Sequence, residues 1–286
     1  MSSSIFTNVS SLNAQRLLSL NTSRLGKSIE RVASGNRIVS GSDDVAGLAI
    51  SDSLRSDVRT LRQAIRNTND GVSLLNVAEG ALAEQSSIII RLRELASQAA
   101  TGSIGQNERQ TLQLEFNSIR SELDRIAETT EFGGKVLLNG ALSSSSRSLD
   151  QFNIQVGIDG SENSRINLNK EVNLSASTAK GLGIDALSID TIEGSLQAMG
   201  TLESAGNALT QIRGRTGAVQ NRLTRTLATL ATSVENLVAA ESTIRDADVA
   251  EEIALLTRNQ ILTQASVSML DQTNLFAQDI IQFLKV

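Results

Sequence analysis

Apolar residues near the C-terminus recur at alternating steps of four and three. The repeat runs through Val249, Ile253, Leu256, Gln260, Thr263, Val267, Leu270, Asn274, Ala277, Ile281 and Leu284. A spacing of 3.5 residues is typical of a coiled-coil seam. At 1.5 Å per residue, the predicted helix is about 54 Å long. Its polar seam positions cost stability, but they can fix register and partner.

A looser version of this pattern occurs at the N-terminus. One short stripe contains Ile5, Val9 and Leu12, and a second stripe, displaced by one position, contains Leu18, Leu25, Ile29 and Val32. Residues 1–37 carry five basic residues and one acid, whereas residues 245–286 carry three basic residues and six acids. Opposite charges and opposed apolar stripes favour pairing of the two segments over two separately solvated helices.

The middle of the chain contains three further helical patterns and one strand pattern. The first helix is expected to start at residues 42–44 and stop at 101–102, the second to cover 112–126, and the third about 188–240. Between 132 and 187, Phe152 to Ile158 alternate with polar residues, and so do Ile166 to Leu174 around a turn at Asp159-Gly160. The predicted fold is mainly α: long antiparallel helices forming coiled-coil bundles from both termini, plus a small β-hairpin region.

Such a terminal pair would leave aliphatic side chains uncovered. Each helix buries one stripe, so Ile261, Leu262, Leu275, Phe276 and Ile280 remain exposed in an isolated pair. Burying an aliphatic side chain stabilises by about 1.5–3 kcal/mol. A second apolar face therefore invites neighbouring copies, and the pattern predicts self-assembly.

Composition excludes most enzyme chemistry. The chain has no Pro, which suits long helices, and no His or Cys, which excludes Ser-His-Asp triads, thiolate nucleophiles and His or Cys zinc sites. Adjacent acids such as Asp43-Asp44 are better explained by helix capping than by acid–base catalysis. We expect no enzyme activity and no cofactor. The net charge of −5 argues against nucleic-acid binding, and no apolar run predicts membrane insertion or a cleavable signal.

Several blocks resemble the bacterial flagellins. Ser34-Gly35-Asn36-Arg37-Ile38, followed by Asp43-Asp44-Val45-Ala46-Gly47, is similar to the flagellin pattern S-G-x-R-I-x-x-x-x-D-D-A-A-G. Arg66 to Gly71 and Ala78 to Leu82 match its next block. Near the other end, Ala240 to Asp248 resembles A-x-S-x-I-x-D-x-D, and Gln260-Ile261-Leu262 and Phe283-Leu284 also fit. The blocks cover roughly 1–140 and 190–286 in the family's order.

The resemblance implies a filament subunit with two domains. Residues 1–43 with 244–286 would form the inner coiled-coil domain in the filament core, and 44–243 a helical bundle with a β-hairpin insert at about 132–187. Outer variable domains would be absent. The implied partners are the chain itself, alone or mixed with other flagellins, the flagellar cap, junction proteins and an export chaperone. The protein would be secreted to the extracellular filament through the flagellar type III channel. The residues expected to carry core assembly are Ile5, Val9, Leu12, Val249, Ile253, Leu256, Val267, Leu270, Ile281 and Leu284.

One further stretch resembles a segment that Toll-like receptor 5 recognises in flagellins. It runs from Ile90 to Gln98, and Arg91, Leu95 and Glu115 match the central contact positions. In an ordinary helix, Leu95 would belong to the core and Arg91 to a solvated face. Contact with a neighbouring subunit is the favoured role of this surface, and receptor binding would be a property of the free monomer.

Three other kinds of protein are alternatives to a filament subunit. A hook–filament junction protein of the same family shares similar terminal helices. A flagellin carrying a metalloprotease insert needs an H-E-x-x-H motif, which a chain without His cannot supply. A generic coiled-coil adaptor fits the periodicity alone but not the ordered motif blocks.

Overall fold

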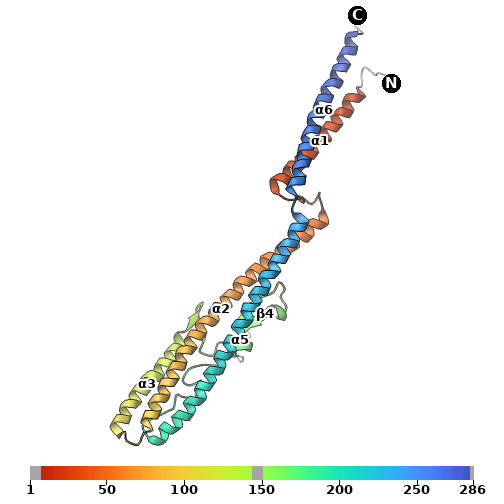
Figure 1. The fold of residues 1–286 in the computed structure, drawn as a ribbon. Coiled ribbons are helices and arrows are strands. Elements are labelled where there is room, and N and C mark those ends of the chain that lie inside the picture. The colour runs from red at the N-terminus through yellow and green to blue at the C-terminus, as the bar shows by residue number, and fades with distance from the viewer. Residues whose placement is uncertain (1–7, 144–150, 284–286) are drawn as a thin grey trace. The chain divides into compact units, whose positions relative to one another are not determined.

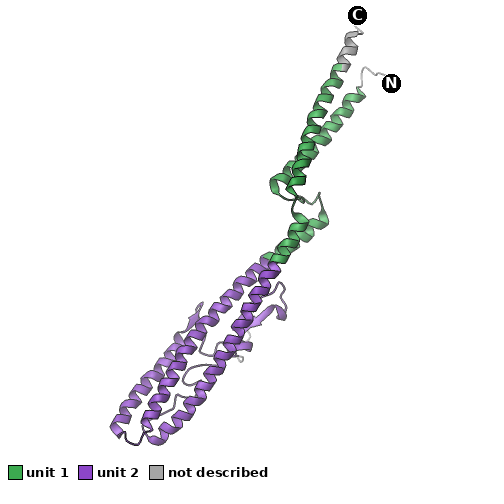
Figure 2. Cartoon of the chain, viewed as in Figure 1, with its two compact units in different colours: residues 1–58, 235–286 green, residues 59–234 purple. Residues whose placement is uncertain are grey.

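The computed structural model describes residues 8–143 and 151–283, with side chains in the last helix through Leu275. Five long helices make up most of the described chain (Figure 1). They are α1 (Val9–Ser34), α2 (Val45–Ala99), α3 (Gln106–Thr129), α5 (Ile192–Arg245) and α6 (Val249–Phe283). The chain divides into two compact units, residues 1–58 with 235–286 (unit 1) and residues 59–234 (unit 2) (Figure 2). The expected domain boundaries at 43/44 and 243/244 stay a prediction.

The helix ends follow local capping chemistry. The side chain of Asn8 accepts a hydrogen bond from Ser11 N at 3.0 Å at the start of α1. The helix ends at Gly35, whose positive φ of 70° suits glycine and whose N–H donates to Arg31 O. Asp44 Oδ1 accepts from Gly47 N at 2.9 Å, so α2 begins at the acidic cap that the sequence predicts.

Unit 2 has an aliphatic core. Side chains from α2, α3 and α5 meet the chain that connects α3 to α5, and Leu92, Leu123, Leu142, Leu174 and Leu209 are all fully buried. Phe116 is the largest fully buried side chain. One buried polar group fastens these layers together: Gln85 Nε2 of α2 donates to Leu123 O of α3 and to Ser177 O of the connecting chain. The core therefore holds the connecting chain against the helices.

Two small antiparallel hairpins lie in unit 2. β1 (Glu131–Phe132) pairs with β2 (Lys135–Val136) through Gly133-Gly134, whose φ values of 60° and 77° fit a type I′ turn. β3 (Asn153–Gln155) pairs with β4 (Arg165–Asn167), with Ile154 opposite Ile166. A single 3₁₀ turn, Glu162–Ser164, precedes β4. The predicted hairpin region is confirmed at β3 and β4.

The prediction of a strand from Ile166 to Leu174 is wrong in its second half. Residues Leu168–Val172 form a short helix, α4. Asn167 caps it by accepting from Lys170 N at 3.0 Å. Leu168 and Val172 are four residues apart, so the helix puts both on one buried face, where the alternation of a strand would also have placed them. The apolar spacing was thus compatible with both structures, and the cap decided between them.

Candidate assembly interface

In unit 1, α1 and α6 run antiparallel and meet along a seam of hydrogen-bonding side chains mixed with half-buried aliphatic ones, among them Leu18, Leu25, Leu256 and Leu270. Asn21 Nδ2 donates to Ser266 Oγ at 2.8 Å, and Asn259 Nδ2 donates to Ser28 Oγ at 3.0 Å. Nearer the N-terminus, Asn8 Nδ2 donates to Thr273 O at 3.0 Å. Such bonds fix the register of the two helices, but each adds only about 1 kcal/mol. The pair is specified by polar contacts more than by burial.

The residues of α6 that face α1 follow the predicted 3.5-residue repeat. At alternate positions, however, the residue that faces α1 is the one before the predicted residue. The least exposed residues are Glu252, Leu255, Leu256, Asn259, Thr263, Ser266, Leu270 and Thr273. Leu256, Thr263 and Leu270 belong to the expected seam, whereas Val249, Ile253 and Val267 are exposed. Two stripes one residue apart both satisfy the repeat, and the hydrogen bonds to α1 select the polar one.

The outward faces of α1 and α6 are therefore rich in aliphatic side chains. On α6, the exposed set is Val249, Ile253, Ile261, Leu262, Val267, Met269 and Leu275, and on α1 it is Val9, Leu12, Leu17, Leu20 and Ile29. These side chains are 40% to 61% exposed. The expected exposure of Ile261, Leu262 and Leu275 is confirmed. Ile5, Leu284 and the side chains of Phe276, Ile280 and Ile281 lie outside the described residues.

Two flagellin-like motifs of unit 1, the one that begins at Ser34 and the one that ends at Asp248, come together in space. Asn36 forms an antiparallel bridge with Asp246, Arg37 N donates to Arg245 O at 2.7 Å, and Ala247 N donates to Gly35 O at 3.0 Å. The Arg37 guanidinium also donates to Ile244 O at 2.6 Å. The charges and apolar stripes of the terminal segments predict that these segments pair, whereas the backbone pairing of the two motifs is seen only in the structure.

Charged side chains hold the loop between α1 and α2 against α1. Asp43 lies 3.5 Å from Lys27 Nζ and 3.7 Å from an Arg31 nitrogen. Hydrogen bonds from the backbone of Ser40, then of Val39, and the charge of Lys27 lower the pKa of the Asp43 carboxyl below its usual value, against a smaller opposing effect of burial. The Asp43 carboxylate is therefore the ionised form, and in that form it holds the loop before α2 in place.

In unit 2, the structure brings together two of the three receptor-like positions, Arg91 and Glu115, and buries the third, Leu95. Arg91 Nη2 donates to Glu115 Oε1 at 2.8 Å, and Arg91 Nη1 donates to Glu94 Oε2 at 3.0 Å. Both bonds, that to Glu115 first, raise the pKa of Arg91. Leu95, by contrast, is only 1% exposed and belongs to the core. Only Arg91 and Glu115 are on the surface, and the exposed side chains of Ile90 and Leu114 adjoin them in sequence.

The described parts of the chain show neither a metal site nor a membrane span. Among residues 8–143 and 151–283, no three acidic side chains gather as a metal ion would require. No helix in these ranges combines the length and apolarity of a membrane-crossing segment.

Comparison with known proteins identifies the family. Residues 5–143 match the bacterial flagellin N-terminal helical region, and residues 199–284 match the bacterial flagellin C-terminal helical region. The flagellar filament 30.7 kDa core protein of Treponema maltophilum is 39% identical over 287 residues, covering 97% of this chain and 98% of that protein. Flagellin of Bacillus subtilis strain 168 is 36% identical over 310 residues, with the same shares covered.

A crystal structure of Bacillus cereus flagellin aligns with 62% of this chain and 94% of that one, at 26% identity and a TM-score of 0.47. The assignment rests on the two matched regions and on the relatives of nearly equal length. Both show that the chain belongs to the bacterial flagellin family.

Proposed function

We propose that this chain, a structural subunit of the bacterial flagellar filament, polymerises through the outward aliphatic faces of α1 and α6. The observation that carries the proposal is an imbalance within unit 1. Among the described residues of these two helices, only Ala14, Ser28 and Glu252 are buried, whereas twelve large aliphatic side chains are exposed. A soluble monomer rarely exposes so much apolar surface, and neighbouring copies would cover it.

The same imbalance explains why assembly would order unit 1. An isolated pair gains little from burial and pays the conformational entropy of about 60 ordered residues, at roughly 1–2 kcal/mol of backbone each. In a polymer, the exposed aliphatics each add about 1 kcal/mol or more. Of the expected core residues that the structure describes, Val9, Leu12, Val249, Ile253 and Val267 lie on this exposed face, whereas Leu256 and Leu270 lie on the inner face of α6.

Polymerisation of the purified chain tests the proposal. Monomer would be mixed with sheared filament seeds, then pelleted and imaged by electron microscopy. A variant lacking residues 250–286 serves as the matched control, because it removes α6 and leaves unit 2 intact. We expect long filaments from the full chain and none from the truncated chain. The truncated chain should keep the helical circular dichroism of unit 2. A full chain that stays in the supernatant with seeds present would overturn the proposal.

Family membership supports further roles. Secretion to the cell exterior through the flagellar export channel, capping at the filament tip, chaperone binding and mixing with other flagellins all follow from a place in the filament. The hook–filament junction alternative gains no support from the relatives, which are named a flagellar filament core protein and a flagellin. Copy number separates the two roles, because a filament subunit outnumbers a junction protein by orders of magnitude.

Recognition of the free monomer by Toll-like receptor 5 is a second proposal. The exposed ion pair of Arg91 with Glu115 supports it, whereas buried Leu95 would act only by supporting the helix. Arg91→Ala should weaken receptor signalling by monomer, measured in reporter cells. Arg93→Ala, which removes a similarly exposed arginine two residues away, is the control. Equal loss in both variants would count against a specific contact.

A further inference from the structure

Charge is segregated along α5 and the segment before it. Residues 181–203 contain Asp185, Asp190, Glu193 and Glu203 and no Lys or Arg. Residues 204–234 contain Arg213, Arg215, Arg222 and Arg225 and no Asp or Glu. Since α5 is one continuous helix, unit 2 carries an acidic end where α5 begins and a basic region further along it (Figure 1).

The antiparallel partner helix reinforces the basic region. Gln220 Nε2 donates to Asn76 Oδ1 at 3.1 Å, and Arg213 Nε lies 2.9 Å from Glu79 Oε1, so the basic half of α5 runs beside the first part of α2 in unit 2. That part of α2, residues 59–79, has three arginines, one aspartate and one glutamate, the Glu79 that pairs with Arg213. Both helices are therefore basic at the same end of unit 2, and the segregation extends beyond α5.

Ion pairs within the chain neutralise only some of these charges. Glu203 pairs with Arg93, Arg213 with Glu79, and Arg222 with Glu171 of α4. Across the described residues, Arg225 and Glu193 have no such partner, and both are exposed. Arg215 is likewise exposed without an ion-pair partner, so two free cations and one free anion remain within residues 192–234 of α5, and Arg225 is the free cation that lines a groove.

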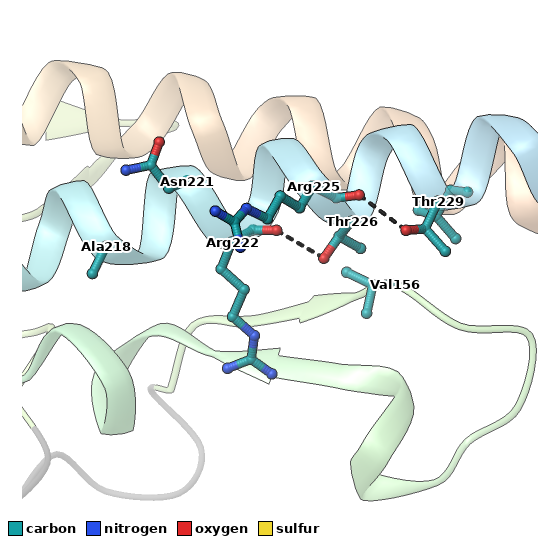
Figure 3. Close-up of a pocket in the computed structure, with 8 residues that line it drawn as sticks. Val156, Ala218, Asn221, Arg222, Arg225, Thr226 and Thr229 are labelled. Carbon is teal, nitrogen blue, oxygen red and sulfur yellow. Dashed lines mark hydrogen bonds between the residues drawn. The ribbon is translucent and has the colours of Figure 1, made fainter.

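Arg225 lies on a groove between α5 and the end of β3. The groove has a volume of about 580 Å³ and is lined by Arg222, Arg225, Thr226 and Thr229 on its polar side, with Val156 and Leu230 as apolar walls (Figure 3). Thr226 donates its hydroxyl hydrogen to Arg222 O at 3.0 Å, and Thr229 donates to Arg225 O at 3.1 Å. With both hydroxyl hydrogens occupied, the guanidinium of Arg225 is the strong free donor, and it suits a carboxylate.

The acidic end carries the complementary groups. Glu193 lies in the first turn of α5. Ile192 and Leu196 beside it are large, apolar and exposed, Leu196 by 60%. A carboxylate flanked by aliphatic side chains matches a groove whose lining includes both a free arginine and apolar side chains. We name residues 185–196 the acidic tip and the lining of the cavity the arginine groove.

We propose that the acidic tip of one copy docks in the arginine groove of a second copy, with Glu193 paired to Arg225 and Leu196 against Val156. The two patches are 32 residues apart on α5, or about 48 Å at the helical rise. Because the contact joins two different patches, a pair of copies still has one free acidic tip and one free arginine groove. Further copies can therefore add by the same contact and form an open row. The inference rests on the proposed function, because an exposed ion pair alone is too weak to hold two chains together.

Charge reversal and exchange test the contact in seeded polymerisation. Arg225→Glu and Glu193→Arg should each raise the critical concentration about fivefold, as expected for losing an exposed attraction and adding a repulsion. The double variant E193R/R225E should return to within about twofold of wild type. At about 1 M salt, where the Debye length is near 3 Å, the single variants should approach wild type.

Lys180→Glu is the matched control. It makes the same charge change as Arg225→Glu, but at an exposed lysine beside the acidic tip. Docking predicts no rise in the critical concentration, whereas general repulsion between more acidic chains predicts the same rise as for Arg225→Glu. Equal rises, or a double variant as defective as the two single variants combined, would overturn the inference. Thermal unfolding of each monomer checks that unit 2 is folded, because Glu193 also favours the start of α5.

The outcomes separate this inference from the function on which it rests. If wild-type chain does not polymerise, both fall. If wild type polymerises and the charge exchange fails to restore assembly, only the docking of the tip falls. A filament image at side-chain resolution gives a direct readout, in which we expect Glu193 of one copy within ion-pair distance of Arg225 of another.

Discussion

Truncating a single outward side chain of α6 should weaken polymerisation without unfolding the monomer. Ile261 is 60% exposed in the single chain. Burying a whole Ile side chain stabilises by about 1.5–3 kcal/mol, so covering this exposed part in a filament should supply about 1–2 kcal/mol. Ile261→Ala should therefore raise the critical concentration by about five- to thirtyfold, since 1.4 kcal/mol is a factor of ten.

Seeded polymerisation followed by sedimentation measures the critical concentration. Gln264→Ala is the matched control, because Gln264 is also exposed and lies one turn along α6, yet its truncation removes little apolar surface. It should stay within about twofold of wild type. Monomer helicity should be unchanged in both variants, since little of Ile261 is covered by α1. An unchanged critical concentration for Ile261→Ala, or equal rises in both variants, would refute burial of this face.

Four other substitutions address the folded chain. Phe116→Ala removes the largest buried side chain of unit 2 and should lower the free energy of unfolding by about 3–5 kcal/mol in urea titrations. The pKa of Asp43 is lower in the folded chain than in the unfolded chain, where it is near 4. Ionised Asp43 therefore stabilises the fold above the unfolded-state pKa, and this contribution is lost as the pH falls through the folded-state pKa. Asp43→Asn should flatten the loss of helicity in this acid range, and an identical acid profile would contradict the assignment. Gly47→Ala would bring a Cβ within 2.7 Å of Ile38 Cδ1 and should lower the melting temperature. Gly80→Ala, with nothing within 4 Å of its Cβ, should instead raise it, since alanine favours helix by about 1 kcal/mol.

The acidic and basic halves of α5 connect unit 2 to the same assembly. Aliphatic contacts of α1 and α6 would supply most of the free energy of polymerisation, because each buries apolar surface. Ion pairs between acidic tips and arginine grooves would add little affinity but would set the axial offset between copies, since like charges oppose other offsets. Salt should therefore change the fidelity of packing more than its strength.

Much of the fold was predictable from the sequence. The absence of Pro and the 3.5-residue rhythm predict long helices, and α2 begins at the acidic cap where the sequence placed it. The alternation around Ile154 and Ile166 predicts the β3–β4 pair. These features depend on residues close together in the chain, and local physical chemistry is sufficient to specify them.

Tertiary structure alone decided which faces meet. In α6, the stripe through Val249, Ile253 and Val267 and the stripe through Glu252, Asn259 and Ser266 fit the same period, and only the hydrogen bonds from Asn21 and to Ser28 of α1 show that the polar stripe faces inward. Likewise, Leu95 is buried and the motifs at Gly35 and Asp246 meet because of contacts remote in sequence. A repeat determines that a helix has a face, whereas the partner that covers the face is a property of the folded chain.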